Sequence, residues 1–285
     1  MVRRLMILIL LGGGIAAAVL LWGLANARAD PVVRRATIAL PHWPRGAPPV
    51  QVALISDIHI GSVVMDGARL RRIVPQVNRL GPDLVLLAGD FVAGHNPAQG
   101  RAFAARLTGP LSLLDARLGV VAVPGNHDHW TDLAAVRSAL DRAGVKVVAN
   151  GAVARGPLAI IGIDDAATGN DSLPIALAAR RRIAGAPLLV THSPDLAPRL
   201  PAGGALLLAG HTHCGQIVVP WWGPIAVPSA YGDRYRCGIV REGGRLVIVT
   251  GGVGTSVVPL RFGAPPDLWL ITVGPARRGV SRARS

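Results

Sequence analysis

Short apolar runs separated by polar turns recur along the chain from residue 36 onward. Runs this short, bounded by Gly, Pro, Asn or Asp, predict buried β-strands rather than helices. The expected strands are residues 36–40, 50–56, 84–88, 120–123, 146–149, 158–163, 188–191, 206–209, 217–219, 238–241, 246–250 and 268–273.

Apolar side chains at helical spacing predict a smaller number of helices. Residues 69–80 and 133–143 show this spacing, although we expect Pro75 to kink or break the first of these helices. Residues 101–118 are expected to be mostly helical, with an interruption at the Gly-Pro pair of residues 109–110. The elements alternate at first and then become richer in strands. This order predicts an α/β fold in which two sheets form a sandwich with helices outside.

The N-terminal segment has a different pattern, because residues 5–25 are continuously apolar and follow Arg3 and Arg4. At about 1.5 Å per residue, such a helix spans a hydrocarbon core of about 30 Å. Residues 25–27 and 27–29 match A-x-A cleavage sites, so a cleaved signal peptide is the alternative. We favour an uncleaved single-pass anchor in the cell membrane.

Composition and charge divide the chain into three parts. We expect residues 1–29 to form the membrane anchor, residues 30–275 the catalytic domain and residues 276–285 a basic, disordered tail. Residues 30–49, rich in Pro and Arg, predict a linker plus an edge strand. The net charge is +14, from 30 basic and 16 acidic residues. Because basic residues are not interleaved with stacking aromatics, no nucleic-acid partner is expected.

The chain has two cysteines, Cys214 and Cys237. Two cysteines form neither a disulfide framework nor a Cys-x-x-Cys zinc motif. A single bridge between them stays open if the domain is extracytoplasmic. Positive charge flanks both ends of the apolar segment, so the positive-inside rule does not decide the side of the membrane. We favour the periplasmic or extracytoplasmic side.

Metal-ligand side chains follow five of the expected strands, where open α/β sheets place their ligands. One strand end bearing an Asp is common, whereas five such ends with Asp, His and Asn predict a shared site at one sheet edge. The five stretches are Asp57-Ile58-His59, Gly89-Asp90, Gly125-Asn126-His127-Asp128, His192 and Gly210-His211-Thr212-His213.

The residue types indicate a site for two divalent metal ions about 3.5–4 Å apart, which would generate hydroxide and neutralise a phosphoryl group. A carboxylate such as Asp90 can bridge the ions. Mixed imidazole and carboxylate ligation suits Mn, Fe, Zn or Co rather than Ca. Glycines 89, 125 and 210 allow close backbone approach and unusual backbone angles.

These motifs, in this order, resemble those of the calcineurin-like metallophosphoesterases. The resemblance implies a four-layer α/β/β/α sandwich with a dinuclear centre. It assigns Asp57, His59, Asp90 and His213 to one ion, and Asp90, Asn126, His192 and His211 to the other. It further implies that His127 stabilises the transition state or protonates the leaving group, and that Asp128 orients His127.

The surrounding residues resemble one branch of that family, the bacterial single-pass membrane phosphoesterases. The matching stretches are Thr191-His192-Ser193-Pro194-Asp195, Gly210-His211-Thr212-His213-Cys214-Gly215-Gln216 and Gly251-Gly252-Val253-Gly254. Cys214 departs from the Gly that is usual there. We interpret it as a small packing residue, with an effect of its sulfur on His213 as the alternative.

The resemblance implies a hydrolase that cleaves phosphodiester or pyrophosphate bonds, with lipid-linked substrates such as a UDP-diacylglucosamine-type lipid A precursor. The alternatives are a nuclease or protein phosphatase, and a non-catalytic metal-binding module that retains the fold.

Other polar and aromatic residues give weaker evidence of a functional role. His95 and His129 lie in loops near the expected site, where they contact phosphate or act as ordinary solvated or capping residues. Asp164-Asp165 is expected to cap a turn. Trp221-Trp222 lies in a Pro- and Gly-bounded loop after His213. The pair forms either an acyl-chain or membrane-interface platform, or part of the ordinary packing.

Overall fold

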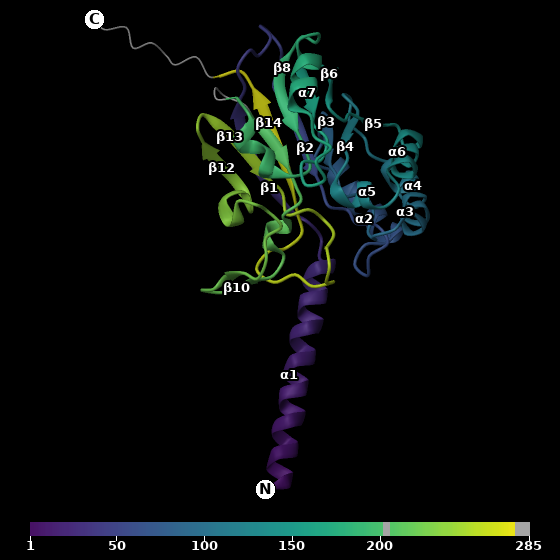
Figure 1. The fold of residues 1–285 in the computed structure, drawn as a ribbon, viewed down its shortest axis with the longest axis vertical. Helices are drawn as coiled ribbons and strands as arrows, with labels where there is room; N and C mark the ends of the chain where they lie inside the picture. The colour runs from purple at the N-terminus through teal and green to yellow at the C-terminus, as the bar shows by residue number, and fades with distance from the viewer. Residues whose placement is uncertain (202–205, 277–285) are drawn as a thin grey trace, which may run out of the picture.

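The strands form two six-stranded sheets that pack face to face (Figure 1). The computed structural model describes residues 1–201 and 206–276. The first sheet has the order β1-β14-β2-β3-β4-β5, and the second has the order β12-β13-β9-β8-β7-β6. The strands of the first sheet are β1 (Val32–Ala39), β14 (Asp267–Gly274), β2 (Val50–Ile55), β3 (Leu84–Ala88), β4 (Val120–Val123) and β5 (Val145–Val147). Those of the second are β12 (Gly238–Glu242), β13 (Arg245–Val249), β9 (Leu206–Ala209), β8 (Ala186–Val190), β7 (Leu158–Gly162) and β6 (Gly151–Arg155).

Alternating side chains of each strand fill two different layers of core. Leu54 and Leu86 of the first sheet meet Leu188 and Leu208 of the second in the layer between the sheets. The opposite face of the first sheet packs against α2 (Gly67–Asn78), α3 (Pro97–Ala104), α4 (Thr108–Leu111) and α6 (Leu133–Arg142). The outer face of the second sheet is covered by α7 (Leu173–Arg180) and the 3₁₀ helix η1 (Pro194–Arg199). The predicted α/β/β/α sandwich is therefore confirmed.

Strand direction determines which loops meet. Strands β2, β3, β4 and β5 are mutually parallel, as are β7, β8, β9 and β13. Their carboxyl ends therefore gather at one edge of the sandwich. Strand β14 is antiparallel to β2 and parallel to β1. Strand β1 consequently begins at the same edge at which β2 ends, and the chain enters the domain beside those loops.

Several predicted elements differ from the structure. Helix α2 continues through Pro75, because that residue lies on the exposed face where water solvates the carbonyl that loses its donor. The predicted interruption at residues 109–110 is wrong, since α4 includes them and the helix breaks at residues 105–107 instead. Strand β6 and helix α7 are short and were not predicted. The predicted tail, residues 276–285, lies almost entirely outside the described residues.

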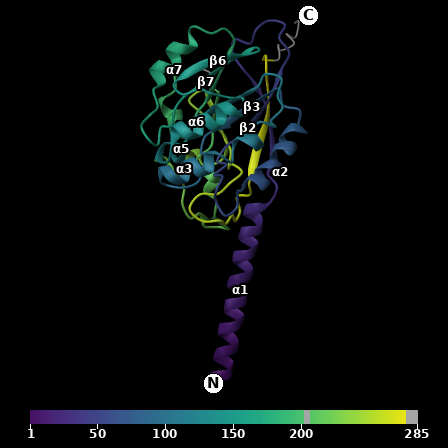
Figure 2. The ribbon, with the colours of Figure 1, turned by 90° about the vertical axis from the view of Figure 1, so that its right-hand side faces the viewer.

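Helix α1 (Val2–Arg28) extends from the domain as an isolated rod (Figures 1 and 2). It is long and apolar enough to cross a membrane by length and composition. Its last turns are tied to the domain. The Gly23 carbonyl accepts a hydrogen bond from Arg261 N at 3.0 Å, and the rings of Trp22 and Phe262 lie 5.4 Å apart. On another side, Arg28 donates to the Val63 carbonyl at 2.8 Å.

Arg261 connects the end of α1 to the loops at the carboxyl edge. Its side chain is fully buried, and burial lowers the pKa of its guanidinium to about 10, which leaves it charged at neutral pH. The guanidinium donates to the carbonyls of Gly251 at 2.6 Å, Gly254 at 2.7 Å, Ala264 at 3.0 Å and His213 at 3.3 Å. One side chain thus supplies donors to three carbonyls of the loop between β13 and β14 and a second donor to the His213 carbonyl, which also accepts from Gln216 N.

Replacement of this arginine should destabilise the whole domain. In Arg261→Met, several buried carbonyls lose their donors, which costs about 3 kcal/mol or more. For a domain of this size, that loss lowers Tm by about 6–12 °C. Thermal unfolding of the full chain in one detergent measures the change.

The matched control is Arg72→Met. Arg72 pairs with Asp30 at the surface, and both side chains are more than half exposed. An exposed pair contributes little, so Tm should stay close to that of the unmodified chain. Equal Tm values for the two variants would contradict the role given to Arg261.

Candidate metal centre

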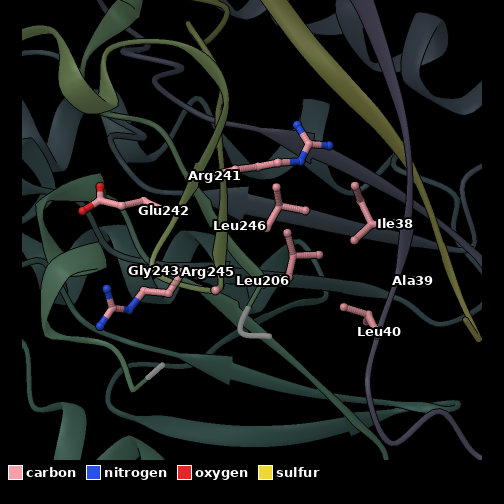
Figure 3. A pocket seen from close by; sticks show the side chains of 10 residues that line it. Ile38, Ala39, Leu40, Leu206, Arg241, Glu242, Gly243, Arg245 and Leu246 are labelled. Carbon is pink, nitrogen blue, oxygen red and sulfur yellow. The ribbon is translucent and has the colours of Figure 1, made fainter. Parts of the chain in front are cut away.

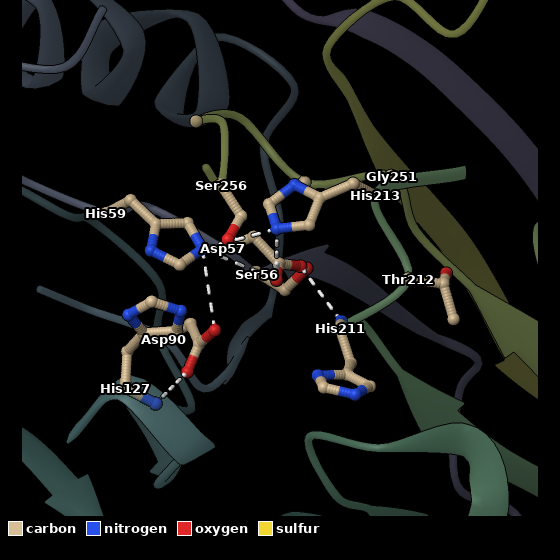
Figure 4. A network of polar contacts seen from close by, with 12 residues as sticks. Ser56, Asp57, His59, Asp90, His127, His211, Thr212, His213, Gly251 and Ser256 are labelled. Carbon is tan, nitrogen blue, oxygen red and sulfur yellow. Dashed lines mark hydrogen bonds and ion pairs between the residues drawn. The ribbon is translucent and has the colours of Figure 1, made fainter. Parts of the chain in front are cut away.

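The predicted ligand residues converge at the carboxyl edge of the sandwich, and both sheets contribute. Figure 4 shows five of them, Asp57, His59, Asp90, His211 and His213. Asp57 and His59 follow β2, Asp90 follows β3, and Asn126 begins the short helix α5 (Asn126–Trp130) after β4. From the second sheet, His192 follows β8, and His211 and His213 follow β9. The parallel strands described above bring these loops together.

The side chains form two adjoining groups. In the first, His213 Nε2 lies 3.4 Å from Asp57 Oδ1 and 3.2 Å from His59 Nε2, and His59 Nε2 lies 3.4 Å from Asp90 Oδ2. In the second, His192 Nε2 lies 3.3 Å from Asp90 Oδ2, 3.1 Å from Asn126 Oδ1 and 3.1 Å from His211 Nδ1. Asp90 belongs to both groups, between them.

The site is buried, and burial changes the protonation of its side chains. It lowers the pKa of His59 and of His211 to about 3, which leaves both imidazoles neutral. Neutral imidazole is the form that coordinates metals. Burial also raises the pKa of Asp57 to about 7. Burial opposes ionisation of Asp90, but the imidazole of His192 holds the pKa of that carboxyl well below its usual range.

The donor set fits divalent cations. Asp57 Oδ1 is buried and has no hydrogen-bond partner within residues 1–201 and 206–276. A buried carboxylate oxygen without a donor is costly unless a cation lies next to it. The surrounding donors are imidazole nitrogens and carboxylate or amide oxygens, which suit first-row divalent metals. Groups of three such side chains place their ligand atoms within 4.8 Å of one another.

The backbone at the site adopts conformations that are uncommon for residues with a Cβ. Asp57, His59, Asp90, His211 and His213 have φ values between 48° and 73°. Left-handed backbone is disfavoured for such residues, and it clusters at functional sites where the surroundings enforce it. Gly89 has φ 82°, and a Cβ there would lie 2.7 Å from His192 Nδ1. The predicted need for glycine at this position is therefore confirmed.

Asp128 has a different contact from the one expected. Its carboxylate accepts hydrogen bonds from the backbone N–H groups of Asp90 at 3.1 Å, Phe91 at 2.9 Å and Gly125 at 2.8 Å. In the described part of the chain it makes no hydrogen bond to the His127 ring. The orienting role expected for Asp128 is not among these contacts, and it stays a prediction. Asp128 instead holds the Asp90 turn against α5.

His127 lies beside the first ligand group. Its ring is 4.7 Å from that of His59, edge to face, and its Nδ1 lies 3.1 Å from the Gly94 carbonyl. The backbone N–H of His127 donates to Asp90 Oδ1 at 2.9 Å. The ring of His95 is 5.1 Å away, across the same cavity. His127 is thus held by backbone contacts, and its Nε2 is not committed to any hydrogen bond with the described residues.

The remaining polar residues have structural partners. His129 Nε2 lies 2.7 Å from Asp164 Oδ1, and the pKa of His129 is raised by this bond. Asp165 accepts from Thr168 N at 2.8 Å, so it caps a turn as predicted. Ser56, which sequence reasoning missed, donates to Asp57 Oδ2. Its position directly before the first ligand was the available signal.

Two cavities differ in their relation to this centre. One, of about 250 Å³, is lined by His59, His95 and His127 together with Val257 and Val258. A second, of about 440 Å³, lies between the end of β1 and the β12–β13 hairpin (Figure 3). Its lining includes Leu206 and Leu246, which begin their strands, so it lies at the opposite edge of the sandwich. The candidate metal centre therefore lies at the smaller cavity.

Cys214 and Cys237 form a disulfide, with Cα atoms 4.7 Å apart. The open alternative is thus confirmed, and the interpretation of Cys214 as a packing residue is wrong. Because Cys214 directly follows His213, the bridge ties the last ligand loop to the segment before β12. Thr212 Oγ1 adds a hydrogen bond to the Arg236 carbonyl at 2.6 Å.

Comparison with known sequences agrees with this geometry. The family model described as calcineurin-like phosphoesterase matches residues 50–177. An uncharacterized metallophosphoesterase, YkuE, of Bacillus subtilis (strain 168) is 31% identical over 239 residues, which cover 81% of this chain and 81% of the relative. An uncharacterized metallophosphoesterase of Helicobacter pylori (strain J99) is 30% identical over 226 residues, 77% of this chain and 58% of the relative.

A Danio rerio protein named transmembrane protein with metallophosphoesterase domain is 28% identical over 272 residues, 89% of this chain and 60% of the relative. This chain therefore spans about three fifths of the Helicobacter pylori and Danio rerio relatives. Among solved structures, the nuclease MPE of Pseudomonas putida aligns over 77% of this chain and 86% of its own, with TM-score 0.38 and 19% identity. On the sequence match to the Bacillus subtilis protein, the chain belongs to the calcineurin-like metallophosphoesterase family and is a metal-dependent phosphoesterase.

Proposed function

We propose that the chain is a membrane-anchored phosphohydrolase with two divalent cations, Mn, Fe or Zn, that cleaves phosphodiester or pyrophosphate bonds. The observation that carries this proposal is Asp90, whose Oδ2 lies 3.4 Å from His59 Nε2 and 3.3 Å from His192 Nε2. A carboxylate shared by two ligand groups is the arrangement that a dinuclear centre needs. One ion is assigned to Asp57, His59, Asp90 and His213, and the other to Asp90, Asn126, His192 and His211.

Bound divalent cations supply Lewis acidity and lower the pKa of water. The protein side chains then have separate tasks. His127 lies at the cavity wall with a ring nitrogen available, so we assign it transition-state stabilisation or protonation of the leaving group. Asp128 is a positioning residue that fixes the Asp90 turn through three backbone donors.

The substrate that we favour is a lipid-linked phosphoester or pyrophosphate, such as a UDP-diacylglucosamine-type lipid A precursor. Helix α1 supports a membrane location, as does the description of the Danio rerio relative as a transmembrane protein. The strand order also supports it, because the chain enters the domain at the edge that carries the ligands. In this proposal residues 1–29 are the anchor and residues 30–275 the catalytic domain.

We further propose that the catalytic domain lies on the extracytoplasmic side of the membrane. The support is the disulfide between Cys214 and Cys237. Disulfides persist in oxidising compartments and are rare in the cytosol. With a single anchor, the N-terminus is then cytoplasmic.

Loss of the shared carboxylate should remove metal. In Asp90→Asn, a neutral amide bridges two cations poorly, so bound metal and hydrolysis of bis(p-nitrophenyl) phosphate should both fall. Elemental analysis of the purified protein and initial rates measure the two quantities. Asp141→Asn, on the exposed surface of α6, is the control and should change neither. Full metal content with unchanged turnover in Asp90→Asn would exclude the assignment.

His127→Ala should separate proton transfer from metal binding. Metal content should stay nearly intact, while turnover of a diester with a poor leaving group falls by about 10²–10⁴, the usual scale for a lost general acid. Nitrophenyl esters need little protonation and should be affected less. His42→Ala, at an exposed position, is the control. An equal loss on both substrates would contradict the acid role and leave electrostatic stabilisation.

The side of the membrane can be read from the cysteines, because the chain has only two. Cells are quenched with acid, and the denatured chain is treated with a polyethylene-glycol maleimide before or after reduction. We expect a mass shift only after reduction. The Cys237→Ser variant, which frees Cys214, should react without reduction. Labelling of the unmodified chain without reduction would place the domain in the cytosol.

A further inference from the structure

An apolar groove of about 470 Å³ adjoins the metal centre. Its lining includes Ile225 and Val227, which follow the hairpin of β10 (Val218–Val219) and β11 (Gly223–Pro224). Val257 and Val258 also line it, as does the metal-ligand candidate His213. Aliphatic side chains thus line a groove that includes a residue of the proposed metal site.

The groove and the catalytic cavity adjoin each other. Ser256, Val257 and Val258 line both the groove and the cavity that contains His59 and His127. A molecule whose phosphate lies at the metal ligands can therefore extend an attached group into the groove. An apolar lining favours a hydrocarbon group over a sugar or a nucleoside.

Large apolar side chains at the turn of the β10–β11 hairpin and at Val257 of the groove lining are exposed to an unusual degree, and we call them the rim. Trp221 and Trp222 are 104% and 85% exposed, and Val257 is 99% exposed. Trp221 and Val257 also have positive φ, 62° and 61°. Left-handed backbone at a β-branched residue is a genuine outlier, and exposed contiguous apolar surface marks an interaction site. Both Trp rings are outside the core, so the packing alternative for this pair is wrong.

The bilayer is the partner that this rim faces. The hairpin is joined to the segment that holds α1, because Val218 N donates to the Phe262 carbonyl at 2.8 Å. Phe262 in turn packs against Trp22 of α1. Figures 1 and 2 show the β10 hairpin at the level where α1 leaves the domain. Tryptophan is enriched at membrane interfaces, where its apolar ring and polar N–H are both satisfied.

We propose that the groove binds an acyl chain of a bilayer lipid whose phosphate lies at the metal centre, with the rim residues Trp221, Trp222 and Val257 in the leaflet. This inference rests on the proposed function, since it names the part of the substrate that the groove holds. A lipid then reaches the ligand residues without leaving the membrane surface. The groove selects substrates by their apolar part, whereas the metals act on the phosphate.

The test uses a series of n-alkyl phosphates, from ethyl to octyl phosphate, as competitive inhibitors of bis(p-nitrophenyl) phosphate hydrolysis by the full-length protein in detergent. The inhibition constant should fall by about two- to fourfold for each methylene that the groove buries. In Ile225→Asp, a charge at the groove wall should abolish most of this fall. Ile225 is 67% exposed, so the variant is expected to fold.

Ile175→Asp is the matched control, because Ile175 is 60% exposed on α7, far from the hairpin. It should keep the full dependence on chain length, which also corrects for partition of the phosphates into micelles. The proposal is refuted if the inhibition constant of the unmodified chain does not depend on alkyl chain length. It is also refuted if Ile225→Asp shows the same dependence as the unmodified chain.

Two further outcomes would point to a different occupant of the rim or to a different function. If the rim instead holds a second copy of the chain, the alkyl series is flat, and Ile225→Asp converts a dimer to a monomer in size-exclusion chromatography. Failure of the unmodified chain to bind metal or to hydrolyse the diester refutes the proposed function rather than the groove.

Discussion

The structure depends on one constraint, namely that carboxylates and imidazoles from two different sheets must stay buried in close proximity to one another. Asp57 Oδ1 and His213 Nε2 are 3.4 Å apart, and Asp90 Oδ2 and His192 Nε2 are 3.3 Å apart. Desolvation of such groups is unfavourable, and their left-handed backbone adds to the cost. Residues of the core between the sheets, such as Leu54 and Leu208, provide the apolar burial that offsets it.

Two buried polar side chains outside the proposed metal ligands keep that arrangement in place. Asp128 accepts from the backbone of Asp90 and Gly125 and so fixes two ligand turns of the first sheet. Arg261 donates to the Gly251 and His213 carbonyls, next to the last ligand loop of the second sheet. Each side chain forms several hydrogen bonds with backbone groups, which is the condition under which a buried polar group is tolerated. The disulfide at Cys214 adds a covalent restraint to the same loop.

The ligand residues at the strand ends could be predicted from the sequence, whereas the side-chain contacts that hold their loops in place could not. Asp57 and His59 could be recognised because each strand end is marked by an apolar run followed directly by ligand side chains. One partner of Asp128, Phe91 N, lies 37 residues away in sequence, and one partner of Arg261, the His213 carbonyl, lies 48 residues away. No sequence motif indicates a contact between a side chain and a distant backbone group. Helix α2 continued through Pro75 because solvent exposure, invisible in the sequence, relieved the missing hydrogen bond.

Topology connects the anchor to the chemistry. Because β1 runs parallel to β14 and antiparallel to β2, the chain emerges from α1 at the edge where β2 delivers Asp57. An edge strand of opposite direction would have placed the anchor at the far end of the sandwich, beside the cavity lined by Leu206 and Leu246. The direction of a single edge strand therefore decides whether the ligand loops lie beside α1 or at the opposite edge of the sandwich. Arg261 links α1 to the ligand loops, since its backbone N–H donates to the Gly23 carbonyl of α1 and its side chain donates to the His213 carbonyl.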